Sequence, residues 1–248
     1  MLIYQYSGGL DGFLSAVFRA YEDKALPDLI TDGTLSEPPL TSKIITVLPD
    51  EAKALRVEQG IHARLGMTGL HQLSYAYASC DPKKNQKLFY WVLSVIKYGS
   101  EVQKRYQDPH VMEFCDMTAR VTLEINHMLG FLRFSQTEEG LYCAEFAPDN
   151  NILPFLMPHF TRRFNDQSFL IHDCKRDLYG VYNGREWKVI SSDQKIPLNP
   201  SEPEIAFRRL WQEYFRSVSI AARENKRLQD SYLPRRYRAF LTEFRDQL

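Results

Sequence analysis

The stretch VMEFCDMTARVTLEINHMLGFLRFSQTEEGLYCAEF, residues 111–146, changes its hydrophobic period near its middle and so decides the fold class. Its first part carries a stripe of side chains at intervals of three and four: Val111, Phe114, Thr118, Val121, Ile125 and Met128. That interval is the repeat of one face of an α-helix, so we expect a helix whose stripe is buried.

From Gly130 onward the same stretch has a period of two. Residues 132–135 alternate between apolar and polar side chains, and residues 142–146 alternate again. Glu138-Glu139-Gly140 lies between them, and glycine supplies the positive φ that a tight turn requires. The second part therefore predicts a β-hairpin.

The N-terminal half is predicted to be mainly helical. We expect strands at Leu2–Tyr6 and Ile44–Leu48, separated by a loop over Pro27–Ser42. The residues that mark the inner faces of the expected helices are Leu10, Phe13, Val17 and Tyr21; Ala54, Val57, Ile61 and Leu65, in a helix capped by Asp50 that ends near Gly66; and Leu88, Val92 and Val95.

The hairpin continues into further strands. Phe169–His172, Leu178–Tyr182 and Arg185–Ile190 are expected strands, the last two joined by Asn183-Gly184, a strong hairpin signal. Before them, Pro154 and Pro158 predict two short helices over residues 149–164, the second beginning at Pro158.

The C-terminal end is again predicted to be helical. Ser201 and Glu204 form a capping box for one helix, and Pro234 begins the last one. The faces expected to be buried are Phe207, Leu210, Tyr214 and Val218, then Tyr237, Leu241 and Phe244. The sequence thus predicts an α+β fold: a central antiparallel β-meander flanked by helices, with a helical N-terminal half and C-terminal end. We expect a single domain over residues 1–248, with a possible subdivision near 105–130.

Composition excludes several classes of protein. The N-terminus lacks the charged and apolar regions of a signal peptide, and no stretch approaches the roughly 18 apolar residues of a membrane span. Cys80, Cys115, Cys143 and Cys174 are too widely spaced for a zinc or iron–sulfur pattern. We therefore expect a cytoplasmic protein with free thiols, no membrane partner, no metal site and no cofactor.

Tyr6-Ser7-Gly8-Gly9-Leu10-Asp11 follows a strand and precedes a helix. It resembles the SGGxD loop with which ATP-pyrophosphatases bind phosphate at a helix N-terminus. Gly12 stands where that motif has Ser or Thr, and the chain is expected to leave the alternating β/α pattern after its first strand. The preferred interpretation is a tight turn capped by Ser7 or Asp11.

Two further motifs could carry chemistry. Glu124 and His127 share one face of the striped helix, but a di-iron site needs a second such pair, so we expect a surface Glu–His contact. His172-Asp173 ends a strand and could form an acid–base pair. No nucleophile motif accompanies it, so the catalytic residues stay unassigned.

Basic residues gather at the end of a chain whose formal net charge is zero. Residues 208–238 hold nine Lys or Arg and three acidic residues, a net charge of +6. Clustered cations with aromatic neighbours suit nucleic acid, in which phosphates attract cations and unpaired bases stack. The expected nucleic-acid-binding residues are His159, Arg162, Arg163, Lys226, Arg227, Arg235, Arg236 and Arg238. The other interpretation of these residues is a set of solvated helix faces and ends.

The chain resembles the family of DNA-metabolism proteins built on domain of unknown function 4130. The matching segments are YSGGLDGFLSAVFRAY (6–21), INHMLGFLRF (125–134), LYCAEFAPDNNILPFLMPHFTRRF (141–164), FLIHD (169–173) and LWQEYFRSVSIAARENKRLQDSYLPRRY (210–237). The family implies a neighbouring radical-SAM protein with a role in DNA modification or repair, and similar domains occur joined to uracil-DNA-glycosylase-like domains. It implies no catalytic residues, and any iron–sulfur cluster would belong to the partner.

Three functions remain in competition. The first is a DNA metabolism or repair accessory protein that binds nucleic acid and works with a radical-SAM partner. The second is an enzyme in its own right, a nuclease or base-processing enzyme that uses His159, His172 and Asp173. The third is a protein-interaction scaffold that does not bind DNA.

Overall fold

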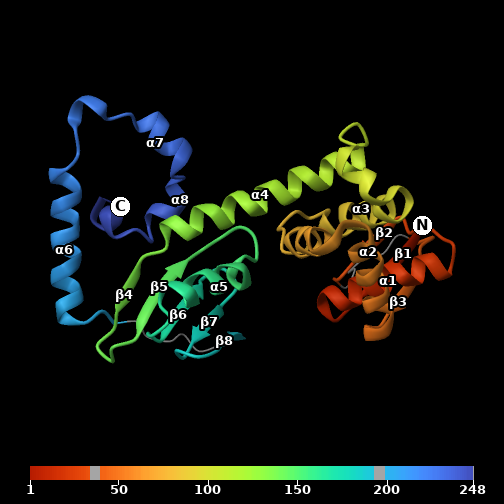
Figure 1. The fold of residues 1–248 in the computed structure, drawn as a ribbon, viewed down its shortest axis with the longest axis horizontal. Helices are drawn as coiled ribbons and strands as arrows, with labels where there is room; N and C mark the ends of the chain where they lie inside the picture. The colour runs from red at the N-terminus through yellow and green to blue at the C-terminus, as the bar shows by residue number, and fades with distance from the viewer. Residues whose placement is uncertain (34–39, 193–198, 248) are drawn as a thin grey trace. The chain divides into compact units, whose positions relative to one another are not determined.

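The computed structural model of the chain describes residues 1–33, 40–192 and 199–247 (Figure 1). The chain divides into two compact units, Met1–Thr122 and Leu123–Leu248. Helix α4 (Pro109–Phe131) contributes its first part to unit 1 and its last part to unit 2. Among the described residues, every helix is too short or too polar to span a lipid bilayer.

Unit 1 combines a small sheet with long helices. Besides the first part of α4, its elements are β1 (Leu2–Tyr6), α1 (Gly9–Glu22), β2 (Leu29–Thr31), β3 (Lys43–Val47), α2 (Glu51–Tyr77), α3 (Lys84–Tyr98) and the 3-10 helix η1 (Gly99–Lys104). The expected strands and helices are confirmed, with two differences. The expected loop contains strand β2, and its residues 34–39 lie outside the described part of the chain. Helix α2 resumes after a break at Gly66, whose φ is 63°.

The sheet of unit 1 is parallel, with the strand order β2-β1-β3. The expectation that the chain leaves the β/α pattern after its first strand is therefore wrong. Strand β2 was missed because three residues inside a segment rich in Pro, Gly and Ser show no alternation. A strand this short is held by pairing with β1, which sequence periodicity does not reveal.

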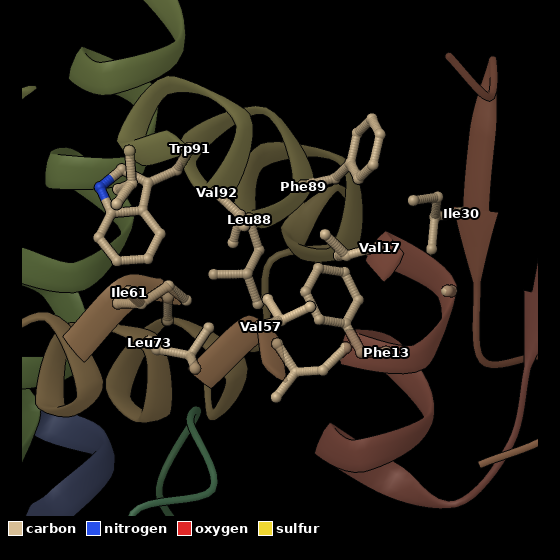
Figure 2. Packing of buried hydrophobic residues seen from close by; sticks show 14 of the residues in the cluster. Phe13, Val17, Ile30, Val57, Ile61, Leu73, Leu88, Phe89, Trp91 and Val92 are labelled. Carbon is tan, nitrogen blue, oxygen red and sulfur yellow. The ribbon is translucent and has the colours of Figure 1, made fainter. Parts of the chain in front are cut away.

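The core of unit 1 lies between α1, α2, α3 and the first part of α4. Figure 2 shows Phe13, Val57 and Leu88 pointing into this cluster. The Trp91 and Phe114 rings stack with centroids 4.1 Å apart at 6°. All six stripe residues of α4 are buried, which confirms that expectation. Tyr21, expected to face the core, is exposed.

Unit 2 contains a five-stranded sheet of order β4-β5-β6-β7-β8. Its elements after α4 are β4 (Phe134–Gln136), β5 (Tyr142–Phe146), α5 (Leu153–Arg163), β6 (Phe169–Asp173), β7 (Leu178–Tyr182), β8 (Trp187–Ser191), α6 (Glu202–Ser217), η2 (Ala221–Arg223), α7 (Lys226–Tyr232), α8 (Arg235–Arg238) and η3 (Thr242–Gln247). Both expected hairpins are present, with Gly140 and Gly184 at positive φ.

The α+β class is confirmed, but the expected antiparallel meander is only partly present, because β5 and β6 pair in parallel. Parallel neighbours need a crossover connection, and α5 supplies it. The carboxyl ends of these two adjacent strands, Phe146 and Asp173, therefore lie side by side.

Helix α5 is one helix instead of the two that its prolines predicted. Pro154 lies in the first turn, where a missing N–H leaves no intrahelical hydrogen bond unmade. Pro158 is exposed, so water can take the place of the bond it cannot donate. Gly180 of β7 allows the helix to approach the sheet, because a Cβ there would lie 2.4 Å from the sulfur of Met157.

Helix α6 differs most from expectation. Ser201 does cap it, accepting a hydrogen bond from Glu204 N. Its predicted buried face is exposed, however: Phe207, Leu210, Tyr214 and Val218. The helix contacts the C-terminal segment of the same unit through the neighbouring face instead. Trp211 Nε1 donates to Glu243, Gln212 Nε2 donates to Thr242 O, and Phe215 packs edge-on against Phe244.

Candidate nucleic-acid interface

A groove with a volume of about 1020 Å³ opens in the C-terminal part of unit 2, between the end of α6, η2, α7 and α8. Figure 1 shows α6, α7 and α8, drawn in blue, near the C-terminal end of the chain. The basic side chains that line the groove are Arg216, Arg223, Lys226, Arg235 and Arg238. Its acidic lining residues are Glu224 and Asp230, so cations are in excess.

The groove also carries exposed apolar and aromatic surface. Tyr232 is 70% exposed at the end of α7, and Leu228 and Ile220 are more than half exposed. An amphipathic ring at the edge of a cationic groove is the arrangement on which unpaired bases stack.

Local capping interactions set the shape of this segment. Asn225 begins α7 by accepting a hydrogen bond from Leu228 N at 3.0 Å. Pro234 then separates α7 from α8, because proline cannot donate the bond that would continue the helix. Asp230, a residue of α7, forms ion pairs with Arg235 and Arg238. These two guanidinium groups hold the pKa of the Asp230 carboxyl below its usual range.

The groove cations differ in how far they are already neutralised. Arg238 is mostly buried, paired with Asp230 and placed over the Phe244 ring. Lys226 lies 3.9 Å from Glu224 in a fully solvated pair. Arg216 and Arg223 are exposed and have no ion pair within the described residues. These two cations are therefore the ones most available to an anion.

Arg236 and Arg227 do not line the groove. Arg236 Nη1 lies 3.0 Å from Asp149, and its Nη2 donates to the Tyr237 hydroxyl at 2.8 Å. Arg227 is exposed on α7, outside the groove lining.

The residues expected on α5 form a separate basic patch. Arg162 and Arg163 are exposed in its last turn, where Arg162 Nε donates to Pro158 O. His159 packs edge-on against Phe160, and its buried Nε2 has no hydrogen-bond partner within the described residues. The structure therefore groups Lys226, Arg235 and Arg238 in one groove and leaves the α5 residues outside that groove's lining.

Glu124 does not make the surface contact with His127 that the sequence suggested. It is 4% exposed and accepts four hydrogen bonds, from Asp149 N, Asn150 N, Asn150 Nδ2 and the Tyr237 hydroxyl, at 2.7–2.8 Å. His127 stacks on Phe131 instead. Burial and the bond to Glu124 raise the pKa of Tyr237, which keeps its phenol protonated as a donor.

This network joins two of the sequence segments that carry the family resemblance. The loop at 148–151 and the LPRRY segment at 233–237 meet on Glu124. Arg176 extends the network by binding Asp173 and the carbonyl groups of Pro148 and Asp149. The sequence analysis noticed Glu124 only for its spacing to His127 and missed this network, because Glu124, Asn150 and Tyr237 are far apart along the chain.

His172 and Asp173 do not face one another. Adjacent residues of a strand point to opposite sides of the sheet. Asp173 is fully buried, where desolvation raises its pKa, and Arg176 binds it. His172 stacks on Tyr179 and lies 3.5 Å from the Cys174 thiol. Burial and the Glu145 carboxylate raise the pKa of Cys174 to about 11, so the free thiol is a poor nucleophile.

The loop at residues 7–12 turns the chain between β1 and α1. Gly8 is the N-cap of α1 with φ 81°, and no side chain caps the helix, so the expected capping by Ser7 or Asp11 is wrong. A Cβ on Gly12 would lie 1.6 Å from Ser7 O, so neither Ser nor Thr fits in this backbone. The backbone of this turn therefore requires glycine at position 12, where the ATP-pyrophosphatase motif has Ser or Thr.

The fold and the groove together define an α+β protein with a cationic, aromatic-lined C-terminal surface. The family model described as a domain of unknown function, DUF4130, matches residues 82–243, more than half of the chain. The chain belongs to this family. No protein in the curated collection of sequences matches it.

Proposed function

We propose that this protein is a cytoplasmic accessory protein of DNA metabolism or repair that binds nucleic acid in the C-terminal groove and works with a radical-SAM partner. The observation that carries the proposal is that two cations without an ion pair among the described residues, Arg216 and Arg223, share one groove with the exposed Tyr232 ring. Phosphates attract the cations, and unpaired bases offer a π-face to the ring.

The groove favours single strands over duplex. Exposed apolar groups, namely Val218, Ile220 and Leu228, lie among the cations of its lining. A duplex hides its base faces and presents only phosphate and groove edges, so it would leave this apolar surface unused. An unpaired strand exposes both its phosphates and its bases to such a surface.

The partner part of the proposal rests on the family resemblance. A radical-SAM protein would carry the iron–sulfur cluster, since the four cysteines of this chain are not spaced to hold one. This chain would then present the nucleic acid to the chemistry of its partner.

A scaffold function is the second candidate, and the exposed face of α6 favours it. Phe207, Leu210 and Tyr214 are each more than half exposed on one side of this helix. A contiguous apolar helix face is typical of a protein-binding surface.

Fluorescence anisotropy of a labelled single strand, measured at several salt concentrations, tests nucleic-acid binding. Each phosphate contact contributes a slope of about −0.7 in log affinity against log salt. The double variant Arg216→Ala/Arg223→Ala should therefore flatten the slope by about 1.4 units. Exposed arginines contribute little to stability, so the melting temperature should stay the same.

Lys188→Ala is the matched control, because Lys188 is an exposed cation of unit 2 on β8, outside the groove. It should bind like the wild type. Wild-type protein without salt-dependent affinity for any strand, alone or with the partner, would contradict the proposal. Equal losses in the control and the double variant would contradict the groove as the site.

A further inference from the structure

Three potential metal ligands meet on one face of the five-stranded sheet. Glu145 of β5 and His172 of β6 are partners in the parallel register, and Cys174 follows His172 by two residues. One ligand atom from each of the three lies within 4.8 Å of the other two. The group combines a carboxylate, an imidazole and a thiol, the three ligand types that zinc accepts.

The distances fit a tetrahedral ion. Zinc binds sulfur at about 2.3 Å and nitrogen or oxygen at about 2.0–2.2 Å, which separates neighbouring ligands by roughly 3.4–3.6 Å. His172 Nδ1 lies 3.5 Å from Cys174 Sγ and 3.8 Å from Glu145 Oε1. The ligand atoms of Glu145 and Cys174 lie within 4.8 Å of each other, and the Glu145 side chain is 38% exposed, so it can move closer to the other two ligands.

The imidazole is held in the orientation that a metal ligand needs. His172 is 93% buried and lies parallel to the Tyr179 ring, with centroids 4.2 Å apart at 2°. Its Nε2 has no hydrogen-bond partner within the described residues and faces the Asp177 carboxylate at 3.5 Å. A carboxylate behind the distal nitrogen is the usual companion of a zinc-bound histidine, because it fixes the tautomer with Nδ1 free to bind.

The thiol is also fixed in place. Cys174 N donates to Phe146 O at 2.9 Å, which ties the residue to the end of β5. The turn that follows brings Asp177 back toward His172, with Asp177 in the left-handed region at φ 50°.

A fourth ligand can come from solvent. The Glu145 side chain is 38% exposed and Cys174 is half-buried, so water can reach the group on the side of these two ligands.

We propose that Glu145, His172 and Cys174 bind a divalent transition-metal ion of the zinc type, with Asp177 orienting His172 and water in an open fourth position. Binding exchanges the thiol proton of Cys174 for the metal and releases that proton to solvent. Three protein ligands with one exchangeable position is the pattern of a reactive zinc site, in contrast to the four-ligand pattern of a structural one.

Cobalt(II) is the probe, because thiolate coordination gives it a charge-transfer absorption that zinc lacks. The full-length protein is stripped with a chelator and titrated with Co²⁺ in the absence of nucleic acid. We expect the band to saturate at one equivalent and to disappear when Zn²⁺, the tighter-binding ion, displaces cobalt. This readout is independent of nucleic-acid binding, so the two proposals fail separately.

Variants assign the ligands. Cys174→Ser should abolish the band, while Cys80→Ser, which removes an exposed cysteine in unit 1, should leave it intact. Asp177→Asn should keep the band but weaken binding by about 10–100-fold, the usual loss for an outer group of a metal site. Glu145→Gln removes a direct carboxylate ligand, so it should keep the thiolate band but weaken binding more than Asp177→Asn does. Circular dichroism of each variant serves as the control for folding. A wild type without the band, a band that survives Cys174→Ser, or one lost in Cys80→Ser would each overturn the proposal.

Discussion

Helices α4 and α6 carry the same kind of apolar stripe, yet only one of the two stripes is buried. On α4 the stripe from Val111 to Met128 is 9% exposed or less at every position. On α6 the stripe of Phe207, Leu210 and Tyr214 is more than half exposed, and the helix packs through Trp211, Gln212 and Phe215. A stripe at helical spacing thus predicts a helix with an apolar face, but a second element must be available to cover that face.

The largest expected effect on stability tests whether the α4 stripe is buried in solution. Phe114→Ala should lower the free energy of unfolding by about 3–5 kcal/mol, because it removes a ring that is 1% exposed and stacked on Trp91. Urea denaturation followed by circular dichroism measures this. Cys115→Ser is a neighbouring control off the stripe. A loss below about 0.5 kcal/mol would show that the stripe is not part of the core in solution.

An intermediate effect is expected where the last part of α4 meets the C-terminal segment. Tyr237→Phe keeps the buried ring but removes the hydroxyl that donates to Glu124 at 2.7 Å. A hydrogen bond to a charged group contributes about 1.5–3 kcal/mol, so the free energy of unfolding should fall by that amount. Glu124 retains three backbone and side-chain donors, which limits the loss.

Tyr232→Phe is the matched control for that variant, because its hydroxyl is on an exposed ring of α7. It should leave stability within about 0.5 kcal/mol of the wild type. Equal stabilities for Tyr237→Phe and the wild type would mean that the Glu124 network does not hold the C-terminal segment in solution.

The same comparison explains what the sequence could predict. Hydrophobic periodicity predicted α1, α3, α4 and both hairpins, because the pattern that marks each of these elements lies within a short stretch of sequence. It missed the parallel pairing of β5 with β6, since an antiparallel and a parallel neighbour produce the same alternation. Two prolines suggested a break in α5, but one lies in the first turn and the other faces solvent.

The candidate sites, like the fold, could be predicted from the sequence only in part. Charge counting drew attention to residues 208–238, and the groove lies within and beside that segment. Counting could not separate Arg223, which is unpaired within the described residues, from Arg238, which Asp230 neutralises. Glu145 joins His172 and Cys174 only through the register of β5 with β6, so spacing along the chain could not reveal the three as a group.

The smallest expected effect on stability tests the α6 side of the comparison. Leu210→Ser replaces an apolar side chain that is 64% exposed, so the free energy of unfolding should change by no more than about 0.5 kcal/mol. Gln212→Ala is the matched control on the packed face, where it removes a hydrogen bond to Thr242 O and should cost about 0.5–1.5 kcal/mol.

The relative size of the two losses in stability decides between two interpretations. If Leu210→Ser destabilises the protein more than Gln212→Ala does, its face is covered in solution and the two helices are alike after all. If it leaves stability unchanged but weakens a complex with the proposed radical-SAM partner by tenfold or more, measured by titration calorimetry, then α6 keeps its stripe exposed for a partner. The difference between the two helices would then be a functional one.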